Sequence, residues 1–385
     1  MELKKYKMKD IVTFLNGRAY LMPELQDKGK YRILRVGNLS GGNDSWYYSD
    51  MELDENKYCE NGDLLYAWAC TFGPHLWKEE KVIYHYHVWK LIENKERVDK
   101  LYLYYYLLHQ TPLYLGGVNG ATMVHITKQN MEKKTVYIPA SLPTQQKIAS
   151  ILSSYDRLIE NNTRRIRLLE QMAENLYKEW FVRFRFPGHE NVEMVNGLPK
   201  GWKKETLDNI AEIHMGSSPK SEYYNNEKKG LPFHQGVGSF GERFVLDDTY
   251  STSYSQIAEP MSILFSVRAP VGRLNYTRNR IIIGRGLATI NHKEDMQSLL
   301  FYTLKTKFFK DDIVGNGSIF TSITKKELLK LKVTVPDKNL KVNFNNKISK
   351  IDRKIDLLYQ QNQLLTRQRD LLLPRLMSGK LEVKS

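Results

Sequence analysis

The chain has 385 residues, of which 41% are hydrophobic, and it carries a formal net charge of +15 at pH 7. Its length suggests on the order of two to three domains with cores of their own, and its excess of lysine and arginine favours a polyanionic partner such as a nucleic acid. Two cysteines exclude a disulfide framework or a cysteine-rich zinc site, and the longest apolar run, Leu101–Leu108, is too short to span a membrane, so we expect a soluble, cytoplasmic protein with no membrane partner.

Residues 1–142 are predicted to form a first globular domain of mixed α/β (α+β) structure. Short apolar runs alternate there with Gly, Asn and Pro at turn spacing, which is typical of many short strands. Tyr102–Leu108 has the length and composition of a helix. Asn119-Gly120 is predicted to form a turn that needs a positive φ.

Residues 143–186 are predicted to form one long helix that begins at Pro143 and ends before Pro187-Gly188. Apolar residues and one asparagine recur there at alternating gaps of four and three, at positions 148, 152, 155, 159, 162, 166, 169, 173, 176 and 180. This spacing favours a coiled coil over a helix that lies on a globular core. Residues 187–200 follow as a linker.

The same order then recurs along the second half of the chain. Residues 201–336 are predicted to form a second domain, with a helix at Leu299–Phe309 and a turn at Asn316-Gly317. Residues 337–379 are predicted to form a second long helix, followed by a tail at 380–385. In this second helix the same spacing, which we call the seam of each helix, occupies positions 344, 348, 351, 355, 358, 362, 365, 369, 372 and 376. Pro374, inside the last turns, is expected to kink or end this helix.

A nearly constant offset relates the two halves, which indicates an internal duplication. The segment NGATMVHITK, which begins at Asn119, and the segment NGSIFTSITK, which begins at Asn316, lie 197 residues apart. Upstream the offset is 199, as between Gly17 and Gly216, and downstream it is 196, as between Asp156 and Asp352. A drift of three residues is what differences in loop length between two copies of one fold would produce.

Each predicted seam contains one asparagine, at Asn162 and at Asn362. In a parallel helix pair each amide would face an aliphatic residue, whereas in an antiparallel pair the two amides fall at the same level. A buried amide needs a partner, and a polar pair can fix helix register. The pair therefore predicts an antiparallel, intramolecular coiled coil; the alternative is that both amides are solvated at the edge of the seam.

Two domains at opposite ends of an antiparallel helix pair would be related by a pseudo-two-fold axis. The first seam spans 33 residues, or ~50 Å at ~1.5 Å per residue. One turn of B-DNA is ~34–36 Å, so such a spacer could hold the domains on successive major grooves. The repeat thus suggests that the chain reads two half-sites separated by a fixed gap.

No catalytic motif or metal site is predicted. The sequence contains neither a phosphate-binding P-loop nor the Asn/Asp-Pro-Pro-aromatic tetrapeptide of amino-methyltransferases. Cys70, His75, His85 and His87 could be combined into a zinc site, but the second half has Gly284 and Gly286 in place of the last two, which argues against a shared metal centre.

The remaining candidates are polar residues in predicted turns that could contact DNA. Arginine suits the O6 and N7 atoms of guanine, asparagine and glutamine suit adenine, and lysine mostly contacts phosphate. The candidates are Arg18, Lys28, Lys30, Arg32, Arg35, Asn38 and Lys78 in the first domain and Lys220, Gln235, Arg268, Arg273, Arg278 and Arg280 in the second. For any one of them, a solvated surface charge is the competing interpretation.

The chain resembles the DNA specificity subunits of type I restriction–modification systems over essentially its full length. The second half carries the resemblance best, through the segments Gly201-Trp202, Gly216-Ser217-Ser218-Pro219, Leu231-Pro232-Phe233 with Gln235-Gly236, Phe265 to Gly272, Asn316-Gly317-Ser318 and Leu373 to Lys380. The first half departs from the family pattern: a segment from Ala67 to Gly73 replaces the turn with Arg-Ala-Pro, so a role for Arg268 cannot be transferred to Trp68.

This resemblance implies two target-recognition domains that each read half of a split double-stranded DNA sequence, and helices that set the spacer and dock two modification (methyltransferase) subunits. Restriction/translocase subunits would complete the complex. It also implies that S-adenosylmethionine and ATP are bound by those partner subunits and that this chain binds no cofactor and catalyses no reaction. Competing interpretations are a free-standing DNA-modifying enzyme and a coiled-coil structural protein that binds nucleic acid.

Overall fold

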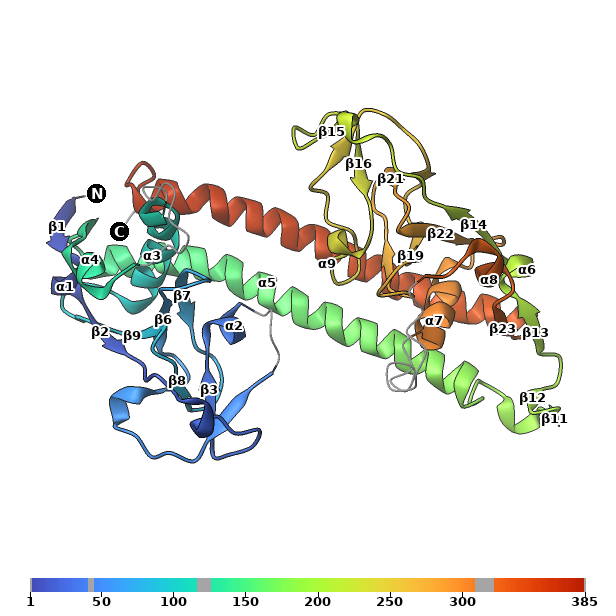
Figure 1. The fold of residues 1–385 in the computed structure, drawn as a ribbon, viewed down its shortest axis with the longest axis horizontal. Coiled ribbons are helices and arrows are strands. Elements are labelled where there is room, and N and C mark those ends of the chain that lie inside the picture. Colours follow the sequence, from blue (N-terminus) through green and yellow to red (C-terminus); the bar gives the residue numbers. More distant parts are fainter. Residues whose placement is uncertain (1, 41–44, 116–125, 309–321, 384–385) are drawn as a thin grey trace. The chain divides into compact units, whose positions relative to one another are not determined.

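The computed structural model describes residues 2–40, 45–115, 126–308 and 322–383. The chain divides into two compact units, a first unit of Met1–Asn162 with Gln360–Ser385 and a second unit of Thr163–Tyr359. Each unit contains a mixed α/β domain and part of each long helix, α5 (Leu142–Tyr177) and α9 (Lys338–Met377) (Figure 1). No helix within the described ranges has the length and apolar character needed to cross a bilayer.

The described part of the domain of the first unit consists of short strands and of helices besides the long ones. The strands are β1 (Leu3–Lys7), β2 (Val12–Asn16), β3 (Tyr31–Leu34), β4 (Tyr47–Ser49), β5 (Tyr58–Cys59), β6 (Leu64–Ala67), β7 (Gly73–Leu76), β8 (Val82–Tyr84), β9 (Val88–Glu93) and β10 (Thr135–Pro139). The helices are α1 (Met8–Ile11), α2 (Val36–Leu39), α3 (Lys100–Leu115) and α4 (Lys128–Lys133).

The domain of the second unit has a similar sequence of elements. Its strands are β11 (Met194–Val195), β12 (Leu198–Pro199), β13 (Lys203–Thr206), β14 (Ala211–Met215), β15 (Tyr224–Asn225), β16 (Leu231–His234), β17 (Tyr250–Ser251), β18 (Ile257–Ala258), β19 (Ile263–Ser266), β20 (Leu274–Tyr276), β21 (Ile281–Ile283), β22 (Leu287–His292) and β23 (Lys332–Val335). Its shorter helices are α6 (Leu207–Ile210), α7 (Gln297–Phe308) and α8 (Lys325–Leu329).

Strand pairing confirms that the two domains are copies of one fold. An antiparallel sheet with the order β2-β9-β6-β7 in the first unit corresponds to β14-β22-β19-β20 in the second. The second sheet has the order β4-β3-β8-β5 in one domain and β15-β17-β16-β21-β18 in the other, and each contains one parallel pair, β3 with β8 and β16 with β21. The offset of 199 residues found in the sequence therefore relates equivalent strands of the two domains.

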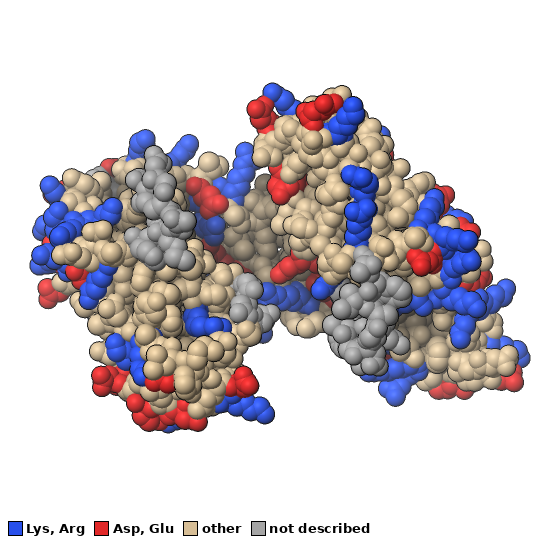
Figure 2. Space-filling model, viewed as in Figure 1, with Lys and Arg blue, Asp and Glu red and all other residues tan. Residues whose placement is uncertain are grey.

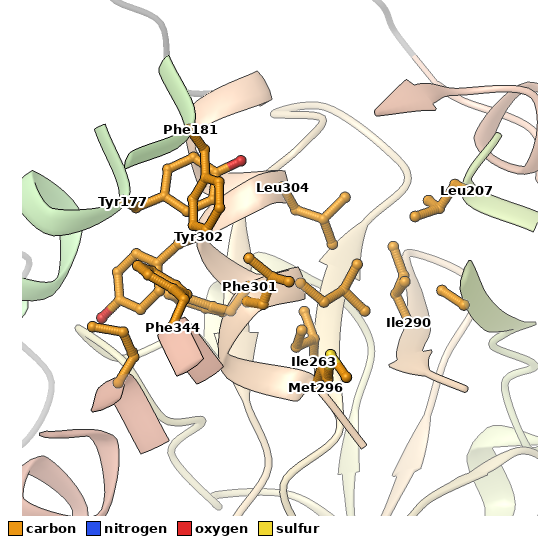
Figure 3. Close-up of a cluster of buried hydrophobic side chains, with 14 of the residues drawn as sticks. Tyr177, Phe181, Leu207, Ile263, Ile290, Met296, Phe301, Tyr302, Leu304 and Phe344 are labelled. Carbon is orange, nitrogen blue, oxygen red and sulfur yellow. The ribbon is translucent and has the colours of Figure 1, made fainter. Parts of the chain in front are cut away.

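Each unit has a core to which its long helices contribute. In the second unit, Tyr177 of α5 and Phe344 of α9 pack with their ring centroids 5.8 Å apart. Figure 3 shows these two rings near Phe301 and Tyr302 of α7. In the first unit, Leu376 of α9 is buried in the cluster that includes strands β2, β6 and β9. The domains are therefore built on the helices as well as on their own sheets.

Within each unit, α5 and α9 pack antiparallel. In the first unit, Arg369 contacts Asp156 at 2.6 Å, and nearer the middle of the helices Asn162 lies beside Gln361. In the second unit, Ile166 packs with Leu358. As the residue number increases along α5, the number of the residue it contacts on α9 decreases. The two helices are therefore antiparallel, as the asparagine positions predicted.

The two seam asparagines face the opposite helix. Asn162 is buried and its Nδ2 donates to Oε1 of Gln361 at 3.4 Å, while Nδ2 of half-buried Asn362 donates to the carbonyl oxygen of Ile159 at 3.4 Å. Both amides therefore lie at the same level of the pair. Their effect on register stays a prediction.

The predicted seam differs in one respect from that of an isolated coiled coil. None of the twenty predicted seam positions, all of which lie within the described residues, is exposed. However, Ile148 and Leu152 pack in the core of the first domain, and Phe344 and Ile348 pack in the core of the second. The heptad spacing thus describes helix–helix packing near the middle and burial against a globular domain at the ends.

Both predicted helix ends need correction. α5 ends at Tyr177 and continues as a π-helical turn at Lys178–Val182, before the predicted end at residue 186. The chain leaves the helix early because Phe184 adopts a positive φ of 58° and packs against Trp202, with ring centroids 5.5 Å apart. Pro374 does not end α9, which continues to Met377, since the core of the first unit buries Leu373 before the proline and Leu376 after it.

The repeated segments around Asn119-Gly120 and Asn316-Gly317 fall largely outside the described residues, and so do the two predicted turns. Their last residues are described and act as helix caps. Oγ1 of Thr127 accepts a hydrogen bond from the backbone N–H of Asn130, and Oγ1 of Thr324 accepts one from Glu327. Threonine is favoured at this position because it satisfies a free N–H of the first turn. The recurrence of Ile-Thr-Lys thus has a structural cause.

Candidate nucleic-acid interface

In the first unit, loops that follow four different strands meet at one end of the two sheets. The turn between β8 and β9 is hydrogen-bonded to the loop after β2, with N–H of Arg18 donating to the carbonyl of Tyr84 and N–H of Tyr86 donating to that of Arg18, both at 3.0 Å. It also contacts the end of β3 through His85 N–H and the Leu34 carbonyl at 2.9 Å. A Cβ on Gly17 would lie 2.3 Å from the carbonyl oxygen of His85, so only glycine fits there.

The second unit repeats this arrangement. N–H of Ser217 donates to Ile283 at 3.0 Å and N–H of Gly284 donates to His234 at 2.8 Å. A Cβ on Gly216 would lie 2.1 Å from the carbonyl oxygen of Gly284. We call residues 17–20, 35, 68 and 85–87 the first loop face, and residues 216–218, 235–236, 267–268 and 284–286 the second loop face. Their equivalence rests on the same backbone hydrogen bonds as well as on the offset.

The first loop face is rich in aromatic rings. Trp68 stacks on Trp89 with centroids 5.8 Å apart, and its indole N–H donates to the carbonyl of Tyr86 at 2.8 Å. The ring of His87 lies 5.0 Å from that of Trp68 and 3.9 Å from that of Tyr86. Burial, with smaller effects of His87 and Arg35, lowers the pKa of His85 to about 4. At neutral pH the His85 ring is therefore uncharged.

The second loop face carries hydrogen-bond donors. Arg268, Arg285 and Gln235 are all exposed. Oγ of Ser218 donates to Oε1 of Gln235 at 2.8 Å and accepts from N–H of Arg285 at 3.1 Å, so one hydroxyl connects two of the loops. The two loop faces have the same backbone arrangement but differ in the chemistry of their side chains.

The candidates of the first domain are mostly engaged with acidic residues. Arg18 pairs with Glu24 at 2.7 Å, Arg32 contacts Glu79 at 2.8 Å and Glu80 at 3.0 Å, Lys30 pairs with Glu52, and Lys78 contacts Glu160 at 2.5 Å. Figure 2 shows acidic side chains gathered at the lower end of this domain, near β3. The structure thus gives these four residues carboxylate partners within the protein, and their contact with DNA stays a prediction.

Three other candidates of this domain lie near the same strands. Arg35 is half-buried, with its guanidinium 4.2 Å from the ring centroid of Tyr47. Oδ1 of Asn38 accepts from N–H of Arg35 at 3.0 Å, and its Nδ2 donates to the Ser45 carbonyl at 3.1 Å, which fixes the short helix α2. Lys28 is exposed. Of this group, Arg35 belongs to the first loop face.

In the second domain, the structure brings Gln235 and Arg268 together on the loop face, and Lys220 lies two residues beyond Ser218 on the same loop. Arg278 is instead fixed to the long helix, since its Nε contacts Oδ1 of Asp356 at 2.8 Å and its guanidinium covers Phe244. Arg280 is exposed and pairs with Glu259 at 3.1 Å. Arg273 directly precedes β20 and its N–H donates to Ser266 Oγ at 2.9 Å.

Two residues on the loop faces were not among the sequence candidates. Tyr86 is 39% exposed at the tip of the β8–β9 turn, and Arg285 occupies the equivalent tip between β21 and β22. The offset of 199 would have aligned them, because it superposes His-Tyr-His on Gly-Arg-Gly. Arg243, away from the loop faces, was also missed; it is buried and pairs with Asp352.

The histidines of the rejected zinc site lie partly together. The rings of His85 and His87 are 4.8 Å apart. Within the described part of the chain, no three His, Cys, Asp or Glu residues are grouped so that they could hold a metal ion.

Comparisons with known proteins identify one protein family, which matches both halves of the chain. The sequence model described as "Type I restriction modification DNA specificity domain" matches residues 1–171 and 199–367. A putative type I restriction enzyme MjaX specificity subunit from Methanocaldococcus jannaschii is 29% identical, with 98% of this chain and 93% of that protein covered. The type I restriction enzyme HindI specificity subunit from Haemophilus influenzae is 25% identical over 68% of this chain and 72% of its own length.

The fold also has a counterpart among solved structures. A crystal structure of the S subunit of a type I restriction–modification system from M. genitalium superposes with a TM-score of 0.63. It covers 98% of this chain and 96% of that protein at 18% sequence identity, so the likeness is one of fold.

Proposed function

The chain belongs to the type I restriction modification DNA specificity family, and from this premise we propose that each of its two domains reads one half of a bipartite double-stranded DNA sequence. It is a specificity subunit of a type I restriction–modification system, with two recognition domains. The observation that carries the proposal is the duplicated loop face, in which one backbone frame presents different side chains in each copy. Two copies with different surfaces can recognise two unlike half-sites.

The charge of the chain supports a DNA partner. Lysine and arginine number 58 against 43 acidic residues, and contacts with phosphate release counterions and add affinity without sequence information. Base discrimination must then come from a smaller set of residues that reach the grooves. The loop faces are suited to this task because their backbones are fixed by hydrogen bonds between neighbouring loops.

We propose that the long helices set the distance between the half-sites and dock the modification subunits. In the first unit, Leu158 of α5 and Leu364 and Leu371 of α9 are each more than half exposed. In the second unit, Leu168, Met172 and Leu357 are likewise more than half exposed. Exposed apolar side chains on helices whose other faces are buried are suited to a protein partner. Two modification subunits, one for each half of the duplicated chain, would use this surface.

On this proposal the chain itself performs no chemistry. S-adenosylmethionine would be bound by the modification subunits and ATP by the restriction/translocase subunits. The modification subunits would take the target adenine out of the helix, and this chain would place them on the correct sequence.

Competition binding at fixed salt tests the proposal. The complex of this chain with its modification subunits should bind its bipartite duplex at least a thousandfold more tightly than a duplex with both halves scrambled. Equal affinity for all duplexes, or a preference for single-stranded RNA, would support a general nucleic-acid-binding protein instead. Methyl transfer or DNA cleavage by the purified chain alone would support a free-standing enzyme.

A further inference from the structure

We propose that the residue at the tip of each loop-face turn determines one base of its half-site, Arg285 by donating to a guanine and Tyr86 by apolar contact with a thymine methyl group. This inference rests on the proposed function, since it assigns bases to a surface already proposed to contact DNA. It concerns the turn between β21 and β22 and the equivalent turn between β8 and β9.

Arg285 differs from three other arginines of its domain in what surrounds it. Arg243, Arg278 and Arg280 each contact a carboxylate within their own unit. Among the described residues, by contrast, no carboxylate forms an ion pair with the exposed Arg285. An exposed guanidinium that no described carboxylate engages can offer its donors to a ligand.

The turn that carries Arg285 is fixed in place. Gly284 donates to the carbonyl of His234 at 2.8 Å and Gly286 donates to that of Gln235 at 3.1 Å. A Cβ on Gly286 would lie 2.5 Å from the Gln235 carbonyl oxygen, so the loop after β16 packs directly against this turn. The backbone of Arg285 is therefore positioned before DNA binds, which lowers the entropy cost of a base contact.

The surroundings of Arg285 favour an acceptor-rich base edge. Oε1 of Gln235 already accepts the Ser218 hydroxyl, which leaves the amide NH₂ as the outward donor. Arg268 is exposed on the adjoining strand end, where the N–H of Val267 donates to the carbonyl of Gly286 at 2.9 Å. Guanine offers O6 and N7 as two neighbouring acceptors in the major groove, and a bidentate arginine is the commonest contact to them.

The first loop face presents the opposite chemistry at the equivalent tip. Tyr86 is held by the indole of Trp68, and its ring contacts those of His85 and His87. The guanidinium of Arg18, whose loop supports this turn, is occupied by Glu24. The face of an aromatic ring at the tip suits contact with the C5-methyl group of thymine.

The test is to map methylated sites and to measure competition binding for the complete complex with Arg285→Ala. We expect discrimination at one guanine of the second half-site to fall by on the order of ten- to a hundredfold, with the first half-site unchanged. Arg285→Lys should also lose discrimination, since lysine keeps the charge but not the bidentate geometry. Arg185→Ala, at an exposed arginine of the same unit just after the π-helical turn, serves as the control and should change neither half-site.

Tyr86→Ala should relax one thymine of the first half-site and leave the second intact. A uniform loss of affinity for all sequences, with a salt dependence reduced by about one charge, would mean that Arg285 contacts phosphate and would overturn its assignment. Unchanged base preferences in Arg285→Ala and Tyr86→Ala would overturn the inference while a bipartite site persists. Absence of any bipartite site in the wild-type complex would overturn the proposed function itself.

Discussion

Asp156 of α5 and Asp352 of α9 lie 196 residues apart at equivalent positions of the duplication, and each accepts hydrogen bonds from its own domain. Oδ2 of Asp156 accepts from the hydroxyl of Tyr105 in α3 at 2.5 Å, and Oδ2 of Asp352 accepts from the hydroxyl of Ser298 in α7 at 2.5 Å. The counter-ions differ: Asp156 pairs with Arg369 of the opposing helix, whereas Asp352 pairs with Arg243 of the recognition domain. One carboxylate position thus secures a domain to a helix in both units.

The Arg243 pair gives the clearest stability prediction. Arg243 and Asp352 are 3% and 6% exposed, and Arg243 also contacts Glu170 at 3.4 Å. Arg243→Met should lower the free energy of unfolding of the second unit by about 3–5 kcal/mol, because it leaves a buried carboxylate without its counter-ion. Urea denaturation of the full chain, followed by fluorescence, measures this loss.

The control for this pair is the double variant Arg243→Met with Asp352→Leu. It should recover much of the lost stability, since no buried charge is then left unpaired. If the loss of unfolding free energy in the double variant equals the sum of the losses in the two single variants, Arg243 and Asp352 are not energetically coupled.

The seam asparagines are expected to fix helix register. Asn162→Leu with Asn362→Leu should raise the thermal unfolding midpoint, because two amides at the seam are replaced by apolar side chains, and should permit a shifted pairing of α5 with α9. A crystal structure of the variant reports the register, and Asn161→Leu, at an exposed neighbouring position, is the control. If the double variant kept the same register, the two asparagines would not fix the register of the helices.

His85 is expected to make the first domain acid-sensitive. Its pKa is lowered to about 4, mainly by burial, whereas an unfolded histidine titrates near 6.5. Between these values the unfolded state binds the proton and the folded state does not, so stability falls as pH falls from about 6.5 to 4. His85→Gln should lose part of this dependence in thermal unfolding at pH 6.5 and 4.5; an identical decline in wild type and variant would contradict the assignment.

The helices are expected to set the spacer between half-sites. Insertion of seven residues into α5 after Asn162 and into α9 after Tyr359 keeps the heptad spacing and adds ~10 Å. We expect the methylated bipartite site to gain about three base pairs between unchanged halves, at ~3.4 Å per base pair. Insertion into one helix only should disrupt the seam and abolish methylation. If the double insertion left the spacer length unchanged, the helices would not set the distance between the half-sites.

Sequence reasoning was most successful where a pattern repeats. The offset between Gly17 and Gly216 identified equivalent loops, and the alternating gaps identified helix positions of which none is exposed, because backbone geometry and burial repeat with the fold. It could not show that Arg18 faces Glu24 or that Arg278 faces Asp356, since such pairs depend on which loops meet in space. Arg285 was missed because it is a single charged residue between glycines in an otherwise apolar segment, which resembles an ordinary turn.

The most direct test replaces residues 1–142 with the first domain of another specificity subunit and maps methylated adenines in DNA from cells that carry the complete system. If each domain reads its own half-site, one half of the methylated sequence changes while the other half and the spacer stay the same. A change in both halves would contradict the account of two independent recognition domains.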